Sequence, residues 1–489
     1  MPNPRRSNTR IPLAALFAAG LCTAAFPLSA ATITVDSVEV NDFDDGICTL
    51  REAILAANQD IAYHGCSTGS GLDQIDFSLP PASTILVMNV PLPAVTEPVA
   101  IIGPGEEELT IDGSGLQPIF LVDSAAAPIS FSLSYLTVAH GHATGSGAGG
   151  AVTVLAGDSG IFQRVVFRDN DSEAGGGAIR VVGTLAAPAG ATVEECFFES
   201  NDGGDGGGGA IYLDHAIAQV HRSTFYINET VAEPEPFPAR GGGAISSYDS
   251  SLQVRTSTFL GNYTLGAGGA ILVFSADPAT PDLFRLSDST LVENVGDGDG
   301  DDVGNVGGVA IAAIPGDPLT AEVQNNLIAD NVDAGSTLLP DIYISGAGIT
   351  TQGFNLIGSN PGVETWFPAG NPNPNGDYVG TPGSPLSPSL GPFDYWGGPT
   401  PVLLPNVVPG GLVVDRGLCW FDNFDQRGYV DPGTGLRAVD DPAIPNQPGS
   451  DGCDIGAAEA GAVAPPTTGL PFVDGFEDGT TSHWSATQG

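Results

Sequence analysis

Apolar and polar residues alternate along most of this chain in short runs, and each run begins just after a pair of glycines. The apolar members lie two positions apart, as in Ile179 with Val181, Ile211 with Leu213, and Ile271 with Val273. A period of two residues predicts β-strands with one buried face. The runs are so short that these strands must be stabilised by stacking on one another.

Two signals recur along the chain and set its repeat. A glycine pair, a small residue and then Ile or Val ends at Val152, Ile179, Ile211, Ile245, Ile271 and, in a looser copy, Ile311. Between these copies an apolar residue, usually Phe, stands three positions before an asparagine. The asparagines are Asn170, Asn201, Asn228, Asn262, Asn294 and Asn331, spaced 31, 27, 34, 32 and 37 residues apart. A unit of this size cannot bury its own apolar face, so we predict an all-β fold, a parallel β-helix of stacked coils.

The residue types in the repeat suggest how each coil turns. Glycine supplies the positive φ that a corner needs, and asparagine tolerates the same left-handed conformation. We therefore expect the asparagines at the corners, with each amide bonded to its equivalent one coil away, and the Phe side chains inside the coil. About nine coils at ~4.8 Å each give a rod about 45 Å long.

One stretch near the N-terminus has helical character. In "CTLREAILAAN", Thr49 and Glu52 have the spacing of a capping box, and the apolar residues Leu50, Ala53, Ile54 and Ala57 share one face. An open coil exposes unpaired backbone and apolar core. We predict a short helix that caps the first coil, held by a disulfide from Cys48 to Cys66 that contributes about 3 kcal/mol.

The N-terminal 30 residues have the features of a secretory signal peptide. Arg5, Arg6 and Arg10 precede an apolar run from Ile11 to Phe26. No later segment has 18 consecutive apolar residues, so we expect no transmembrane helix.

The five cysteines that remain after the signal peptide suggest two disulfides. Export favours disulfide formation, and Cys48 with Cys66 and Cys419 with Cys453 are the economical pairs because the two cysteines of each pair lie within one local segment. Cys196 is then left over as a buried small apolar residue, and no cysteine spacing suggests zinc.

The charge of the chain restricts its partners. Loss of the signal peptide leaves 57 acidic and 11 basic residues, a formal charge of about −46, and every basic residue is Arg. Such a surface repels nucleic acid and anionic lipid and favours divalent cations. The absence of Lys excludes Schiff-base chemistry and lysine bases.

Several motifs carry family resemblances. "CTLREAI" at Cys48–Ile54 resembles the CSLREA domain of bacterial secreted proteins, and the glycine and asparagine repeats resemble those of chlamydial polymorphic outer-membrane proteins. The motifs "GFNLIG", "GGPT", "DQRG" and "CDIGAAE", between Gly353 and Glu459, are similar to the choice-of-anchor Q domain. These resemblances imply a right-handed, pectin-lyase-like β-helix, secreted or displayed at the bacterial outer-membrane surface. The choice-of-anchor Q domain usually has an Arg two residues after "DQRG", where this chain has Val430. We expect Arg437 to replace that Arg.

The motifs and the repeat together divide the chain into five parts. They are a signal peptide (1–30), a CSLREA-like cap (31–75), the β-helix (76–360), a C-terminal domain (361–461), and a linker with a short tail (462–489). The tail resembles a sorting signal, and the alternative is a frayed acidic terminus. Too few residues follow Glu459 for the autotransporter barrel of the polymorphic proteins.

The chain contains candidate catalytic residues, but no sequence motif connects them. A lyase or a glycoside hydrolase needs clustered carboxylates with a base or a water between them. Two groups offer such residues: Glu194, Glu195 and Glu199 near Arg168 and Arg180, and Asp214 with His215 near His221. The alternative is that these charges lie solvated on the outer strand faces. His140 and His142 are two ligands on one turn, which do not make a metal site.

The best cation candidate is "GDGDGDD", with Asp297, Asp299 and Asp301. It begins like a calcium loop, but Asp302 replaces the expected Gly and Gly308 stands where a bidentate Glu is needed. Either the loop binds calcium weakly, or it is a flexible acidic loop; "NDFDDG" at Asn41–Gly46 poses the same alternatives. The fold itself requires no cofactor.

Three functions are compatible with a secreted β-helix of this composition. The first is a secreted or cell-surface β-helix that is not an enzyme and binds a surface glycan or cell-surface component, as an adhesin does. The second is a polysaccharide lyase or hydrolase acting on acidic polysaccharide, and the third is a structural envelope component. The sequence leaves the oligomeric state and the ligand open.

Overall fold

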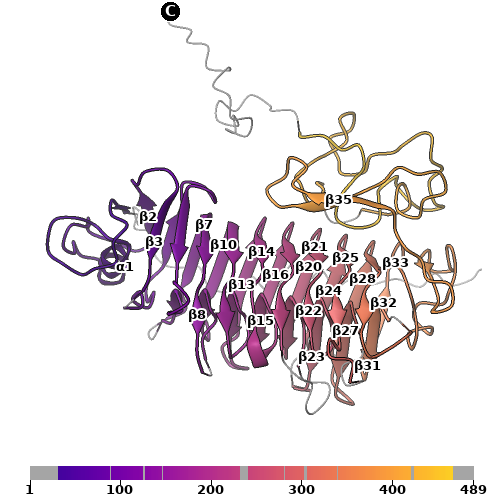
Figure 1. The fold of residues 1–489 in the computed structure, drawn as a ribbon, viewed down its shortest axis with the longest axis horizontal. Helices are drawn as coiled ribbons and strands as arrows, with labels where there is room; N and C mark the ends of the chain where they lie inside the picture. The colour runs from indigo at the N-terminus through magenta and orange to yellow at the C-terminus, as the bar shows by residue number, and fades with distance from the viewer. Residues whose placement is uncertain are drawn as a thin grey trace, which may run out of the picture.

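A computed structural model describes residues 31–465 except 89, 125–126, 146, 232–239, 280, 302–305, 339 and 420–422. The described chain is almost entirely β, and its strands stack in parallel, coil upon coil, into an elongated body (Figure 1). The predicted all-β parallel β-helix is therefore confirmed. The predicted signal peptide (1–30) and most of the C-terminal linker and tail (466–489) lie outside the described residues.

Each coil contributes strands to successive rows. The first row consists of β1 (Thr32–Val35), β2 (Asp73–Phe77), β4 (Val99–Ile102), β7 (Ser130–Ala139), β10 (Ser159–Arg168), β13 (Ala189–Glu194), β16 (Ala216–His221), β20 (Ser251–Arg255), β24 (Leu283–Ser287), β28 (Thr320–Gln324) and β32 (Gly348–Thr351). The second consists of β3 (Ser83–Leu86), β5 (Leu109–Asp112), the later halves of β7 and β10, β14 (Phe197–Glu199), β17 (Thr224–Tyr226), β21 (Thr258–Leu260), β25 (Thr290–Val292), β29 (Leu327–Ala329), β33 (Leu356–Ile357) and β34 (Tyr378–Val379).

Two further rows close the coils. The third row consists of β6 (Phe120–Val122), β9 (Val152–Val154), β12 (Ile179–Val182), β15 (Ile211–Asp214), β19 (Ile245–Tyr248), β23 (Ile271–Ser275), β27 (Val309–Ala313) and β31 (Ile342–Ser345). Short strands form a fourth row: β8 (His142–Ala143) with β11 (Asp171–Ser172), then, after the 3-10 helix η2 (Gly204–Gly206), β18 (Glu229–Thr230), β22 (Tyr263–Thr264), β26 (Val295–Gly296) and β30 (Val332–Asp333). The register corrects one detail: Ile271 pairs with Val309, so the looser repeat copy ends there and not at Ile311.

A glycine pair precedes most third-row strands, and its two glycines have different tasks. Gly242 has a φ of +68°, which supplies the left-handed turn that was predicted. Its neighbour Gly243 is needed for space, because a Cβ built there would lie 2.2 Å from the backbone oxygen of Gly269 in the next coil. The second glycine therefore lets consecutive coils approach each other closely.

The asparagines form the predicted ladder through the buried corner. Asn201 Nδ2 donates to Asn228 Oδ1 at 2.9 Å, and Asn228 Nδ2 donates to Asn262 Oδ1 at 2.9 Å. One part of the prediction was wrong: the left-handed residue is the one before the asparagine, such as Ile227 with a φ of +47°. The turn comes one residue early so that the asparagine side chain can point inward and bond along the rod.

The Phe residues of the repeat stack inside the rod, as predicted. The rings of Phe167, Phe198, Phe225 and Phe259 are buried, and consecutive centroids lie 4.9, 4.6 and 4.5 Å apart with nearly parallel planes. Offset or stacked aromatic pairs add to the burial of apolar area. These four consecutive coils place Phe at the same position, so their rings form a continuous column, which Val138 and Leu291 extend at its two ends.

The helix near the N-terminus caps the first coil. α1 (Leu50–Gln59) begins at the N-cap Thr49, whose Oγ1 accepts from Glu52 N at 3.2 Å, while Glu52 Oε2 accepts from Thr49 N at 3.0 Å. Its predicted apolar residues are buried against β1 and β2. Cys48 and Cys66 form the predicted disulfide. Figure 1 shows α1 at the indigo end of the rod.

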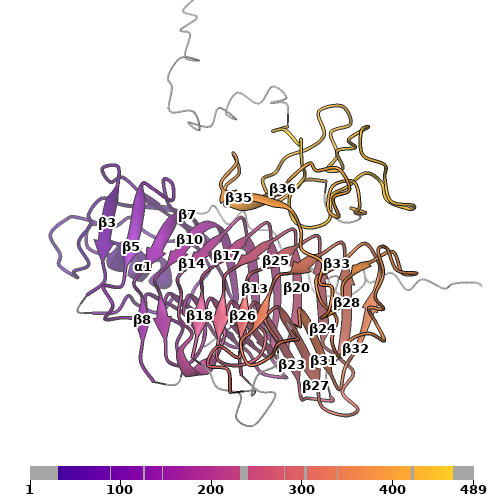
Figure 2. The ribbon, with the colours of Figure 1, turned by 45° about the vertical axis from the view of Figure 1, so that its right-hand side comes forward.

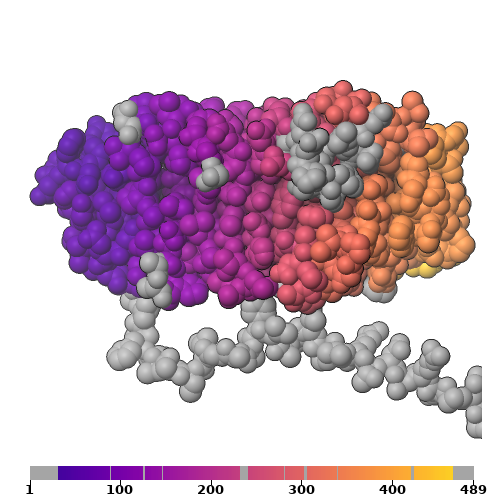
Figure 3. Space-filling model, turned by 90° about the horizontal axis from the view of Figure 1, so that it is seen from below, coloured from indigo at the N-terminus to yellow at the C-terminus, as the bar shows by residue number. Residues whose placement is uncertain are grey.

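At the other end the chain covers the last coil and then turns back. Val363 and Phe367 join the main core next to β33, and so close this end. Residues beyond 385 return along the second row, where β35 (Leu390–Asp394) pairs with β36 (Val402–Pro405) in antiparallel fashion. Both ribbon views place this orange and yellow segment along one flank of the coils (Figures 1 and 2). Seen from below, the coils follow one another in sequence order along the long axis (Figure 3).

Buried polar groups attach the returning segment to the rod. Thr224 Oγ1 donates to Pro401 O at 2.7 Å, and Thr258 Oγ1 donates to Gln426 Oε1 at 2.6 Å. Ala457 N donates to Thr290 Oγ1 at 3.0 Å. Three threonines at one position of successive coils therefore hold a segment that is far away in the sequence. Among the described residues no helix is long and apolar enough to cross a membrane.

Candidate functional site

The glutamates that were considered for catalysis are paired with arginines of neighbouring coils. Glu195 lies at the bend between β13 and β14, and its Oε2 accepts from Arg164 Nε at 2.7 Å. Arg222 Nη2 lies 2.7 Å from Glu194 Oε1 and 3.0 Å from Glu195 Oε1. Since each carboxylate already has a cationic partner, none is placed to act as a free general base in this arrangement.

The remaining candidates of that group are divided between different faces. Arg168 pairs with Glu199 at 2.6 Å in the second row. Arg180 belongs to the third row, where its guanidinium lies 4.2 Å from the ring centroid of Tyr212 and donates to Ala174 O. The structure therefore does not bring Arg180 to the glutamates.

The paired histidines of "HGH" do not share a site either. His140 Nδ1 lies 3.0 Å from Asp112 Oδ2, and His142 Nδ1 lies 2.7 Å from Asp171 Oδ2. His140 Nε2 also lies 3.8 Å from Asp169 Oδ2, so both rings contact carboxylates of adjacent coils.

The third and first rows meet at a corner that carries a cleft of about 170 Å³. His215 lies on its wall, and its Nδ1 is 2.6 Å from Asp214 Oδ1. That hydrogen bond, opposed by partial burial, raises the pKa of His215 above its ordinary value. Asp249 and Asp282 line the same cleft, and burial raises the pKa of Asp282.

Apolar side chains complete the cleft. Leu185 and Ile217 are 52% and 55% exposed there, next to Pro188 and Pro281. His221, the third residue of the predicted set, lies at the far end of β16 beside Glu194 and is no part of the cleft. Apolar walls with a few convergent polar groups are typical of binding sites. The cleft therefore has the composition of a ligand-binding site.

Comparison with known proteins does not assign this chain to a family. No family model, no curated protein and no solved structure matches this chain. Its function has to be argued from its own residues.

The acidic loop, for which weak calcium binding was one of two alternatives, brings three carboxylates together. Asp297, Asp299 and Asp301 each place one oxygen within 4.8 Å of the other two. Asp297 is buried, and its pKa is raised to about 6, first by burial and then by repulsion from Asp333. Asp302 lies outside the described residues.

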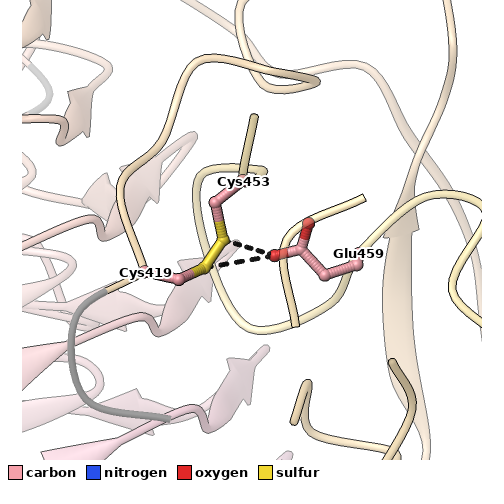
Figure 4. A group of neighbouring side chains, drawn as sticks. All are labelled: Cys419, Cys453 and Glu459. Carbon is pink, nitrogen blue, oxygen red and sulfur yellow. Dashed lines mark hydrogen bonds between the residues drawn. A yellow bond between two sulfur atoms is a disulfide. The ribbon is translucent and has the colours of Figure 1, made fainter. Parts of the chain in front are cut away.

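Two other clusters with metal-ligating residue types have structural explanations. His64 Nδ1 lies 3.0 Å from Glu52 Oε1 and 3.3 Å from Asp42 Oδ1, so it partners the buried capping-box carboxylate. Cys419 and Cys453 form the second predicted disulfide, and Glu459 Oε1 lies 2.8 Å from Cys453 Sγ (Figure 4). Because the two sulfurs are bonded to each other, they offer no thiolate to a metal. Cys196 is free and buried, as predicted.

Glu459 also belongs to a buried charge network under the returning segment. Arg437, 1% exposed, donates from Nε to Glu459 Oε1 at 2.9 Å and places Nη1 3.3 Å from Asp288 of the rod. Burial and the nearby Asp454 raise the pKa of Glu459, while Arg437 opposes that shift. The position of Arg437, expected only from a resemblance, is thus a contact between the segment and the β-helix.

Sequence reasoning missed the cleft and the contribution of Asp333. His215 and Asp249 occupy the same corner position in consecutive coils, and Asp282 precedes the next first-row strand. Asp333 follows Asn331 by two residues, just as Gly296 follows Asn294. Alignment of the coils on their asparagines would have placed Asp333 beside the loop that begins at Asp297.

Proposed function

We propose that this protein is a secreted or cell-surface β-helical rod that acts by binding a glycan of neutral or cationic character. The observation that carries the proposal is the pairing of the flank charges between coils. Arg164 with Glu195, Arg168 with Glu199, Arg222 with Glu194, and Arg285 with Glu322 are all in contact. Because these glutamates are paired with arginines, they are not free to act as the carboxylate pair of a glycoside hydrolase.

The cleft beside Ile217 is the proposed binding site. Its exposed apolar walls give contact area, and Asp249 and Asp282 offer acceptors to hydroxyl or amino groups. The net charge of −43 for the whole chain repels uronic-acid polymers and attracts cationic ones. Electrostatics therefore favours neutral and amino sugars over the acidic polysaccharides that the enzymatic alternative requires.

Two exposed isoleucines on the same sheet allow a matched test. Ile217 on β16 lines the cleft and is 55% exposed, whereas Ile161 on β10 is 41% exposed and is not a cleft residue. We expect Ile217→Arg to weaken binding to neutral or amino-sugar glycans on an array by about tenfold or more, and Ile161→Arg to leave it unchanged. Equal effects of the two substitutions, or no binding by the wild type, would overturn the proposed site.

The enzymatic alternative is tested with the same preparations. Purified protein is incubated with uronic-acid polymers, with and without calcium, and new unsaturated or reducing ends are measured over time. Binding without turnover supports a binding protein. Sustained turnover that is lost in His215→Ala would replace this proposal by a polysaccharide lyase or hydrolase that uses the same cleft.

Display at the cell surface rests on the N-terminal signal sequence and on the C-terminal tail. Protease shaving of intact cells compares the full chain with a version that ends at Thr468. If the full chain is retained at the surface and the truncated chain is released, the tail is an anchor. Release of both would mean that the protein acts away from the cell.

A further inference from the structure

The acidic loop after β26 has the dimensions of a cation site. Asp297, Asp299 and Asp301 approach one another within 4.8 Å through one carboxylate oxygen each. Calcium binds oxygens at 2.3–2.6 Å, so two ligands on opposite sides of the ion lie about 5 Å apart. The separations in the loop therefore match ligands that share one ion.

A buried oxygen in this loop has no partner to neutralise it. Asp297 is 1% exposed, and its Oδ2 has no hydrogen-bond partner in the described part of the chain. Its Oδ1 accepts only a 3.2 Å hydrogen bond from Asp301 N among the bonds identified there. A buried carboxylate oxygen without a donor is costly, and a cation removes that cost.

The neighbouring coil brings a fourth carboxylate to the loop. In the pairing of β26 with β30, Gly296 lies opposite Asp333. Asp333 is therefore close to Asp297, the residue after Gly296. Asp333 is 3% exposed, and after burial its charge is the next cause that raises the pKa of Asp297. This carboxylate compensates for Gly308, which replaces the bidentate Glu of a single-loop calcium site.

Tyr263 of the preceding coil packs against the same loop. A Cβ built on Gly298 would lie 2.2 Å from Cζ of Tyr263, so the ring directly contacts the backbone between Asp297 and Asp299. Burial, and then the charge of Asp299, raises the pKa of Tyr263. The loop is thus fixed between two coils, one that supplies the ring and one that supplies Asp333.

We propose that Asp297, Asp299 and Asp301, together with Asp333 of the next coil, bind one calcium ion that joins adjacent coils of the rod. Hard carboxylate oxygens at flexible spacing favour calcium over the smaller magnesium. Because the site uses side chains of two coils, the ion is expected to stabilise this part of the rod. This inference does not depend on the proposed glycan binding.

Terbium, which replaces calcium and emits when a nearby tyrosine is excited, reports on this site specifically. We expect the full mature chain to show sensitised emission that calcium displaces, with a calcium Kd of about 10⁻⁴ to 10⁻³ M, the range of extracellular modules. Tyr263→Phe should lose most of the emission yet keep the calcium affinity measured by calorimetry. Undiminished emission in this variant would place the ion elsewhere and overturn the proposal.

Three substitutions test the ligands. Asp299 is exposed, so Asp299→Asn should fold normally and weaken calcium binding at least about tenfold, and Asp297→Asn and Asp333→Asn should do the same. Asp205 lies exposed in a glycine-rich loop of an earlier coil, and Asp205→Asn serves as the control. Calcium affinities equal to that of the control in Asp299→Asn and Asp333→Asn, or no calcium binding by the wild type at millimolar concentration, would overturn the inference.

Discussion

The buried asparagine ladder should contribute strongly to local stability, and Asn228→Ala measures how much. The side chain of Asn228 takes part in four hydrogen bonds: it accepts from Asn201 N and Asn201 Nδ2, and it donates to Phe198 O and Asn262 Oδ1. All four are 2.9–3.1 Å long, and Asn228 is fully buried. At about 1 kcal/mol for each hydrogen bond, the substitution should cost about 4 kcal/mol.

The cost should appear first in the coil that carries the substitution and in the coils next to it, because the energetics of stacked repeats are dominated by nearest neighbours. Hydrogen exchange measured by mass spectrometry gives the free energy of local opening for peptides that contain β14, β17 and β21. We expect a loss of about 4 kcal/mol there and much smaller changes at α1. The exposed Asn406, replaced by Ala, is the matched control.

Two results would refute this reasoning. A loss below about 1 kcal/mol at β17 would mean that water replaces the ladder without cost, against the expected penalty for unpaired buried groups. An equal loss at α1 and at β17 would mean that the rod opens as one unit, so that the effect of a single coil cannot be localised.

Three further predictions concern the cap, the coil spacing and pH. Cys48→Ser should loosen the N-terminal cap by about 3 kcal/mol and expose a reactive Cys66 thiol; unchanged melting with an unreactive Cys66 would contradict the role of the bridge. Gly243→Ala should destabilise its coil by about 3 kcal/mol in urea unfolding because its Cβ meets the next coil, whereas Gly348→Ala, which has open space, should not. Burial raises the pKa of Asp341 to about 7 from an ordinary 3.8. The folded state therefore holds this proton more tightly than the unfolded state, so its contribution to stability is greatest below about pH 4 and is lost as pH rises to about 7. Unfolding free energies measured from pH 4 to 8 should fall with pH, and less steeply in Asp341→Asn.

Much of the architecture follows from signals that each coil repeats. The glycine pair, the inward Phe and the Asn recur once per turn, so their spacing alone predicts stacked coils, a Phe column and an amide ladder. The capping box at Thr49 and Glu52 is equally local, since both partners lie within one turn of helix. The conformation of the corner was predicted less well. Either of two adjacent residues can adopt the left-handed conformation, and the direction in which the Asn side chain must point decides between them.

The sites depend on register between coils, which the sequence specifies only indirectly. The sequence shows that Glu194 and Glu195 are adjacent carboxylates, but only the structure shows that Arg222 of an adjacent coil contacts both of them. Likewise, Arg437 contacts Asp288 only because the C-terminal segment folds back along the rod.

The sequence by itself determined the stacked-coil fold, the helical cap and the presence of an acidic loop, because each of these is written in residues a few positions apart. The tertiary structure alone decided that His215, Asp249 and Asp282 share a cleft and that Arg437 contacts Asp288. Loops of different length separate the coils, so residues that meet across the stack have no fixed spacing in the chain.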